Sequence, residues 1–229
     1  CAGPLRQAEL QACEKVLDNP ARPLVAIIGG AKVSTKIGLL ENLLNTVDVL
    51  ILGGGIANTF LTAAGYMVGK SLYEEDLVPE AKKVMEQAKT INKELPLPMD
   101  VITAEELAPG QHASLHAVGD VPGDQMILDV GPETLTLYEK YLAKAATVVW
   151  NGPVGAFETE PFGDGTKALA EYLGNSKAFV VVGGCDSVAA VEKYGLADRM
   201  GYISTGGGAS LELLECKKLP SVAALEDRG

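Results

Sequence analysis

Residues 24–36, LVAIIGGAKVSTK, decide the fold of this chain, because an apolar run ends there in two glycines and two lysines. Further apolar runs of this kind lie at 49–52, 99–102, 147–150, 179–182 and 202–204. Runs that are almost continuous in apolar residues are typical of strands covered on both faces. Stretches with helical spacing separate them, and this alternation is typical of a parallel sheet.

The alternation predicts an α/β fold: a three-layer, Rossmann-like, six-stranded parallel sheet with helices on both faces. The predicted helices cover residues 7–17, 34–44, 56–64, 79–93, 133–145, 166–173, 187–194 and 209–215. Residues 108–129 lack a clear period and are rich in turn signals, so they predict turns with a small hairpin.

Glycine-rich turns follow all of the predicted strands except the one at 99–102. They contain Gly29-Gly30, Gly53-Gly54-Gly55, Asn151-Gly152-Pro153, Gly183-Gly184 and Gly206-Gly207-Gly208. In a parallel sheet the carboxyl ends of the strands share one edge, which is where ligands bind. Glycine lets a backbone approach a ligand closely. One such turn often serves packing alone, but several at one edge indicate a binding site.

Three charged residues lie in these turns. Lys32 and Lys36 stand four residues apart at the entrance to a predicted helix, where they could share one anion with free N–H groups. The alternative is two solvated surface lysines. Asp186 follows a glycine turn, where it suits either a Mg²⁺ ion with phosphate oxygens or a simple helix N-cap.

Familiar nucleotide fingerprints are absent. A P-loop would need a glycine at Ala64, five residues before Gly69-Lys70-Ser71, and no GxGxxG occurs. His112 and His116 have the spacing of a zinc pair but lack the glutamate of HExxH, so a metal role is disfavoured.

Composition narrows the classes of partner. The net charge of −11 argues against nucleic acid and anionic membranes, and no apolar run is long enough for a membrane span. The four cysteines form no CxxC pair, so free thiols and a cytoplasmic location are expected. The absence of an initiator Met and of a signal-like segment leads us to expect a piece of a longer chain.

Taken together, these motifs resemble phosphoglycerate kinase. The resemblance extends from residue 1 to about residue 224 and rests on GGAKVSTK (29–36), GGG (53–55), VWNGPVGAFE (149–158), GGCD (183–186) and STGGGA (204–209). It implies a two-domain, monomeric enzyme that transfers a phosphoryl group to and from a carboxyl group in glycolysis, with ATP/ADP and Mg²⁺. This chain would be the C-terminal, nucleotide-binding domain, and the missing N-terminal domain would bind phosphoglycerate.

The resemblance also implies roles for individual residues. Lys32 would act on the phosphoryl group in flight, with Gly184 and Gly207, and Asp186 would hold the Mg²⁺ of the nucleotide. The other implied contacts with the nucleotide are Lys36, Gly53, Gly54, Leu128, Asn151, Pro153, Glu158, Cys185, Ser187, Gly206 and Gly208. Among these, Gly53, Gly54 and Leu128 would form the adenine walls, and Glu158 would take the ribose hydroxyls.

The implied organisation has three parts. Residues 1–17 would form an interdomain helix, 18–217 the nucleotide-binding domain, and 218–229 an arm that packs on the missing domain. One departure concerns Cys185, which replaces the family's usual glycine and could crowd the phosphates. Ser187 replaces the usual threonine and keeps its hydroxyl. Two rival functions remain open: a dinucleotide-binding module of the Rossmann class, and a scaffold that has lost its ligand.

Overall fold

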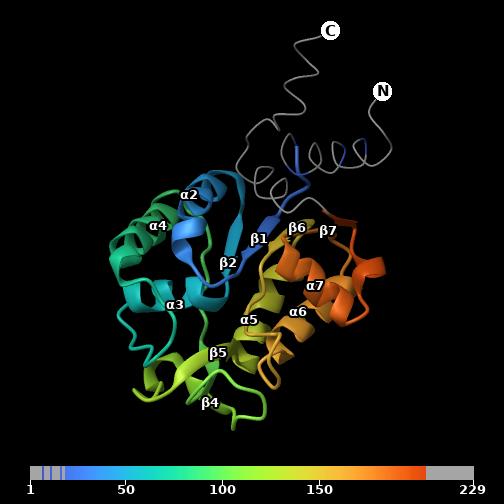
Figure 1. Ribbon diagram of the computed structural model, residues 1–229. Coiled ribbons are helices and arrows are strands. Elements are labelled where there is room, and N and C mark those ends of the chain that lie inside the picture. Colours follow the sequence, from blue (N-terminus) through green and yellow to red (C-terminus); the bar gives the residue numbers. More distant parts are fainter. Residues whose placement is uncertain (1–6, 8–10, 12–15, 17–18, 205–229) are drawn as a thin grey trace, which may run out of the picture.

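The computed structural model in Figure 1 describes residues 7, 11, 16 and 19–204 of the chain. The predicted helix at 209–215, and all but three residues of the one at 7–17, lie outside the described residues. The same holds for the predicted arm at 218–229, so the division of the chain into three parts stays a prediction.

A parallel sheet forms the middle layer. Its strands are β1 (Leu24–Ile28), β2 (Val49–Leu52), β6 (Thr147–Asn151), β7 (Phe179–Gly183) and β8 (Tyr202–Ile203). They run in the order β2-β1-β6-β7-β8, and every neighbouring pair is parallel. All residues of β1, β2 and β6 are buried, which explains why these runs are apolar at almost every position rather than at alternate ones.

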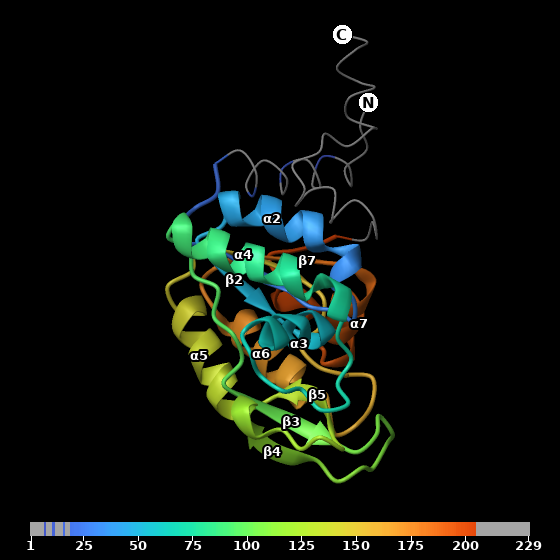
Figure 2. The ribbon, with the colours of Figure 1, turned by 90° about the vertical axis from the view of Figure 1, so that its left-hand side faces the viewer.

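Helices cover both faces of this sheet (Figures 1 and 2). On one face lie α2 (Ile37–Thr46), α3 (Gly54–Ala63) and α4 (Val78–Thr90), and on the other α5 (Pro132–Leu142), α6 (Asp164–Asn175) and α7 (Cys185–Lys193). Alternate residues of β1 serve the two cores: Ala26 and Ile28 pack with α2 and α3, and Val25 and Ile27 pack with α5 and α6. The predicted three-layer α/β fold is confirmed.

One predicted strand belongs to a different sheet. The run at 99–102 forms part of β3 (Asp100–Ala104), which pairs antiparallel with β4 (Ser114–Ala117) and β5 (Met126–Val130). The parallel sheet therefore has five strands, not six, and a second sheet has the order β4-β3-β5. A short apolar run does not by itself reveal its partners, because its alternation is the same in either sheet.

Two finer predictions also change. Residues 108–129 contain β4 and β5, but each pairs with β3 rather than with the other, so they form no hairpin together. The predicted helix at 34–44 is divided: a 3₁₀ turn covers Val33–Thr35, Lys36 has φ −132°, and α2 begins at Ile37. Further 3₁₀ turns cover Glu75–Leu77, Val118–Asp120 and Ala197–Arg199.

In the part of the chain that the structure describes, no helix is both long and apolar enough to cross a membrane.

Candidate functional site

The glycine turns meet at the carboxyl edge of the parallel sheet. The N–H of Gly29 donates to the carbonyl of Asn151 at 2.9 Å, and that of Gly53 donates to the carbonyl of Ile28 at 3.0 Å. A Cβ atom on Gly29 would lie 1.9 Å from the carbonyl oxygen of Pro153, closer than any real contact. The turns after β1, β2 and β6 therefore pack backbone against backbone, which only glycine permits here.

Lys36 points inward at this edge. Its Nζ donates to the carbonyl of Gly29 at 2.6 Å and to Oδ1 of Asn151 at 2.9 Å. Burial lowers the pKa of the Lys36 ammonium, and the nearby charge of Asp186 offsets part of that shift. Asn151 is itself buried, and its Nδ2 has no partner in the described residues. Lys36 and Asn151 therefore place an ammonium and an amide N–H without a partner in the described residues next to each other.

Helix α7 begins beside this pair. Gly184 precedes the helix with φ 87°, and its position for a Cβ lies 3.1 Å from Nδ2 of Asn151. Cys185 is the first helical residue and is exposed. Among the described residues, Asn92 is the non-glycine residue with positive φ, so Cys185 is not strained in place of a glycine. The Ser187 hydroxyl is buried and accepts the N–H of Gly152 at 2.5 Å.

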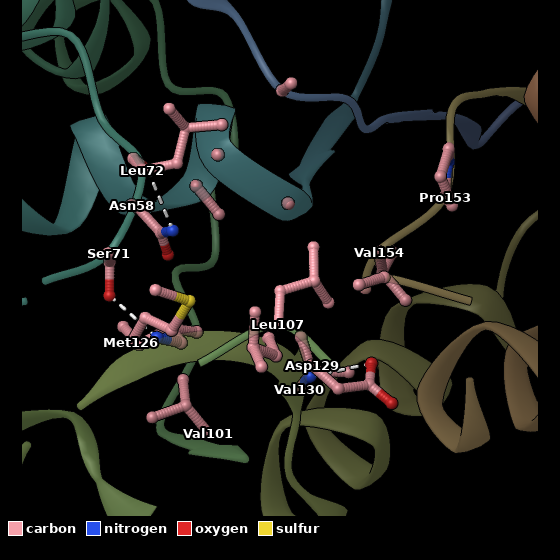
Figure 3. Close-up of a pocket in the computed structure, with 18 of the residues that line it drawn as sticks. Asn58, Ser71, Leu72, Val101, Leu107, Met126, Asp129, Val130, Pro153 and Val154 are labelled. Atoms are coloured by element: carbon pink, nitrogen blue, oxygen red, sulfur yellow. Dashed lines mark hydrogen bonds between the residues drawn. The ribbon is translucent and has the colours of Figure 1, made fainter. Parts of the chain in front are cut away.

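A cavity of about 710 Å³ opens between this edge and the antiparallel sheet (Figure 3). The predicted site residues that line it are Gly54, Leu128, Pro153, Glu158 and Asp186. Of the acidic residues in the lining, Asp186 and Glu158 are exposed to solvent. The structure thus brings together residues that lie up to 132 positions apart, from Gly54 to Asp186.

The far wall of the cavity is apolar. Figure 3 shows side chains from β3, β5, the segment after α3 and the connection from β3 to β4, among them Val101, Met126, Leu72 and Leu107. Asn58 adds an amide, whose Nδ2 donates to the carbonyl of Leu72 at 3.1 Å. A flat, mostly apolar group with a few polar atoms would fit this wall.

Asp129, on β5, lines the cavity and links that strand to α6. It is 2% exposed, and its carboxylate accepts the N–H of Gly165 at 2.8 Å and that of Val130 at 2.9 Å. A Cβ on Gly155 would lie 2.2 Å from Oδ1 of Asp129. Burial raises the pKa of the Asp129 carboxyl to about 7, although these N–H groups lower it in part.

Several predicted site residues do not line the cavity. Lys32 is exposed at the start of the 3₁₀ turn, and Gly53 packs against Val154. Lys36, Asn151 and Gly184 do not belong to the lining. Cys185 and Ser187 lie at the start of α7, outside the lining. Gly206, Gly207 and Gly208 lie outside the described residues.

The sequence interpretation missed most of the apolar wall. Asn58, Leu72, Val101, Leu107 and Met126 line the cavity without belonging to any motif that stood out. What distinguishes two of these residues is that they are apolar but exposed: the exposed fraction is 56% for Leu72 and 52% for Leu107. Exposure of this kind follows from the tertiary structure and cannot be predicted from a single sequence.

Comparison with known proteins gives a consistent result. The family model described as phosphoglycerate kinase matches residues 1–217. The chain is 86% identical over all 229 residues to a phosphoglycerate kinase of Desulfovibrio desulfuricans, of whose length it covers 59%.

Solved structures agree with this result. Phosphoglycerate kinase from Coxiella burnetii superposes with a TM-score of 0.97 at 52% identity, and the match covers all of this chain and 59% of that one. The enzyme from Pyrococcus horikoshii OT3 gives a TM-score of 0.83 at 29% identity, over 96% of this chain and 56% of that one.

Proposed function

This chain belongs to the phosphoglycerate kinase family, and we propose that it supplies the nucleotide-binding half of that enzyme. The observation that carries the proposal is the cavity at the carboxyl edge of the parallel sheet. Gly30, Gly54 and Asp186 line one end, where the Lys36 ammonium lies beside Gly30 and α7 begins, and an apolar wall forms the other end. Phosphates suit the first end and a purine base suits the second.

We propose these roles for the residues at the phosphate end. Lys36 binds the terminal phosphates of the nucleotide, and the unused N–H of Asn151 joins it. Gly184 presents its N–H at the start of α7, with Gly206, Gly207 and Gly208 predicted to do the same. Lys32, exposed at the start of the 3₁₀ turn, reaches the phosphoryl group during transfer.

At the other end, the adenine base lies against Leu128 and Gly54. Both residues line the cavity, and Pro153 lies between the base and the phosphates. Glu158 receives the ribose hydroxyls, since its carboxylate lines the same cavity and has no hydrogen bond in the described residues. Gly53, Cys185 and Ser187 then serve by shaping the backbone around the nucleotide.

Magnesium fits as a companion of the nucleotide. Asp186 is exposed and lines the cavity next to the phosphate end, and the described residues contain no group of three or more potential ligands. One carboxylate with phosphate oxygens is the arrangement that Mg²⁺ uses in kinases, where the ion neutralises charge on the phosphates. Asp186 would therefore hold the ion only when the nucleotide brings it.

The proposed reaction is the reversible phosphorylation of ADP by 1,3-bisphosphoglycerate. A terminal oxygen of ADP attacks the phosphorus of the acyl phosphate, the bond from phosphorus to the acyl oxygen breaks, and 3-phosphoglycerate leaves as a carboxylate. The protein needs cations and N–H donors around the transferred group, not a covalent nucleophile. The residues that bind phosphoglycerate would come from the part of the relatives that this chain does not cover. The isolated chain should then show little turnover.

A monomeric full-length enzyme and a cytoplasmic location stay predictions. The dinucleotide-binding alternative is disfavoured, because the turns around the cavity contain no GxGxxG. The retained Lys32, Lys36, Glu158 and Asp186 oppose the alternative of a scaffold without a ligand.

Calorimetric titration of the 229-residue chain tests the proposal. MgADP and MgATP should bind, whereas 3-phosphoglycerate and NAD⁺ should not. Lys36→Ala provides the matched variant with a weakened phosphate end. Tight binding of 3-phosphoglycerate, or no binding of MgADP, would overturn the proposal that this chain binds the nucleotide and not phosphoglycerate.

A further inference from the structure

Lys193 holds the segment that carries Glu158. Its Nζ donates to the carbonyl of Phe157 at 2.8 Å and lies 3.2 Å from Oε1 of Glu160. The same ammonium lies 5.8 Å from the centre of the Phe157 ring and 5.5 Å from that of Tyr194. One cation therefore holds the residues on both sides of Glu158.

Glu158 depends on such support. Its side chain is exposed at the cavity and makes no hydrogen bond within the described residues. The backbone around it is fixed by the N–H of Ala156, which donates to the carbonyl of Leu128 at 2.8 Å, and by a turn from Thr159 to Ala156. Lys193 supplies the contacts that come from a different element, and the buried ring of Phe157 completes the anchor.

Lys193 and Asp186 lie at opposite ends of the same helix, α7. Lys193 is its last residue, and Asp186 lies in its first turn. The two lie seven positions apart in the helix, a distance of about 10 Å along the axis. Helix α7 therefore touches the phosphate end of the cavity with one end and the Glu158 segment with the other.

We infer that Lys193 is a positioning residue for the ribose end of the nucleotide, because it fixes the Phe157–Glu160 backbone so that the Glu158 carboxylate faces the cavity. The inference rests on the proposed function. It adds a second role for α7: the helix sets the distance between the phosphate contacts and the ribose contact.

A purely structural role would have a different signature. A cation in the last turn of a helix also stabilises that helix through its dipole. Loss of that effect would loosen α7 as a whole and weaken phosphate binding as much as ribose binding. The two roles are therefore separated by a nucleotide that lacks the ribose hydroxyls.

The experiment compares MgADP with the magnesium complex of 2′,3′-dideoxy-ADP, by calorimetry on the 229-residue chain. Lys193→Met should raise the Kd of MgADP about fivefold, because the Glu158 carboxylate is held less firmly towards the ribose, and leave the Kd of the dideoxy nucleotide unchanged. Lys193→Arg should bind both like the wild type, since it keeps the charge. Lys177→Met, at another exposed lysine, is the matched control and should change neither.

Each outcome decides the matter. Equal weakening of both nucleotides by Lys193→Met, or no weakening of MgADP, overturns the inference and leaves the proposed function intact. Failure of the wild-type chain to bind MgADP overturns the proposed function instead. If Lys193→Met does not fold, Glu160→Ala removes one partner of the ammonium. It should raise the Kd of MgADP about twofold and spare the dideoxy nucleotide; an equal effect on both would reject the role.

Discussion

The two walls of the cavity are built in opposite ways. At the phosphate end, the backbone of the parallel sheet forms the surface, and glycines allow turns to lie in direct contact, as Gly29 does against Pro153. At the base end, side chains on and near the antiparallel sheet form the surface, among them the half-exposed Leu107. Where backbone packs against backbone, an added Cβ atom cannot be accommodated. Where side chains form the surface, a side chain can lose a few methyl groups without disturbing the fold. The following variants test that contrast, from the largest expected effect to the smallest.

Gly29→Ala should cost the most. Its Cβ would collide with the backbone of Pro153, and neither strand end can move without disturbing the sheet. We expect the free energy of unfolding to fall by more than about 4 kcal/mol, measured by urea denaturation. The control is Gly38→Ala in α2, where nothing lies within 4 Å of the new Cβ, and which should stabilise the chain slightly. A mild effect of Gly29→Ala would mean that the turns are not packed as described.

Asp129, on β5 of the antiparallel sheet, hydrogen-bonds to α6 and should make stability depend on pH. With a pKa raised from 3.8 to about 7, its folded form keeps a proton that the unfolded form releases between about pH 4 and pH 7. The free energy of unfolding should fall by up to about 4 kcal/mol as pH rises through that window, and then level off. Asp129→Asn should remove this fall in urea titrations at several pH values. Exposed Asp124→Asn, shortly before β5, should keep it.

The roles proposed for Lys36 and Lys32 predict that nucleotide binding and phosphoryl transfer respond to different variants. Lys36→Ala should weaken MgADP binding by about 1.5–3 kcal/mol, the scale of a charge-assisted contact. Lys32→Ala should leave binding almost unchanged. In a chain joined to the remainder of the Desulfovibrio relative, it should lower kcat instead, because its interaction is made chiefly in the transition state. The opposite pattern, a raised Kd with intact kcat for Lys32→Ala, would reverse the two assignments.

Leu107→Ala tests the base end. Its side chain lines the cavity while 52% exposed, so truncation should weaken MgADP by about 1 kcal/mol with little loss of stability. Binding of magnesium pyrophosphate, which has no base, should not change. Leu115→Ala, 54% exposed on β4 but not part of the lining, should affect neither ligand. Equal losses for both ligands would place the base elsewhere.

Cys185→Gly should have the smallest effect. Because Cys185 has helical geometry at the start of α7, glycine should lower the free energy of unfolding by about 0.5–1 kcal/mol through the entropy of the unfolded chain. Bound MgADP should also slow alkylation of this exposed thiol, since the phosphates would lie beside it. An increase in stability on substitution would show that the side chain strains the turn after all.

The difference between the two walls also explains what could be predicted. Glycines at the ends of apolar runs predicted the edge of the sheet where the turns meet, because close backbone packing there demands glycine. The predicted strand at 99–102 was assigned to the wrong sheet, although it alone lacked a following glycine turn. The apolar wall could not be recognised in the sequence, because leucine, valine and methionine that line a cavity form the same sequence pattern as those in a hydrophobic core.

The sequence by itself determined the alternation of elements, the three layers and the turns that form the edge of the site. Each follows from local chemistry: backbone geometry at glycine, apolar periodicity and the charge of a few residues. Only the tertiary structure decided that Lys36 points inward to Asn151, that Ser187 supports Gly152, and that Lys193 reaches the Glu158 segment. These contacts join residues 35 to 115 positions apart, and their partners are chosen by the packing of whole elements, which no local pattern records.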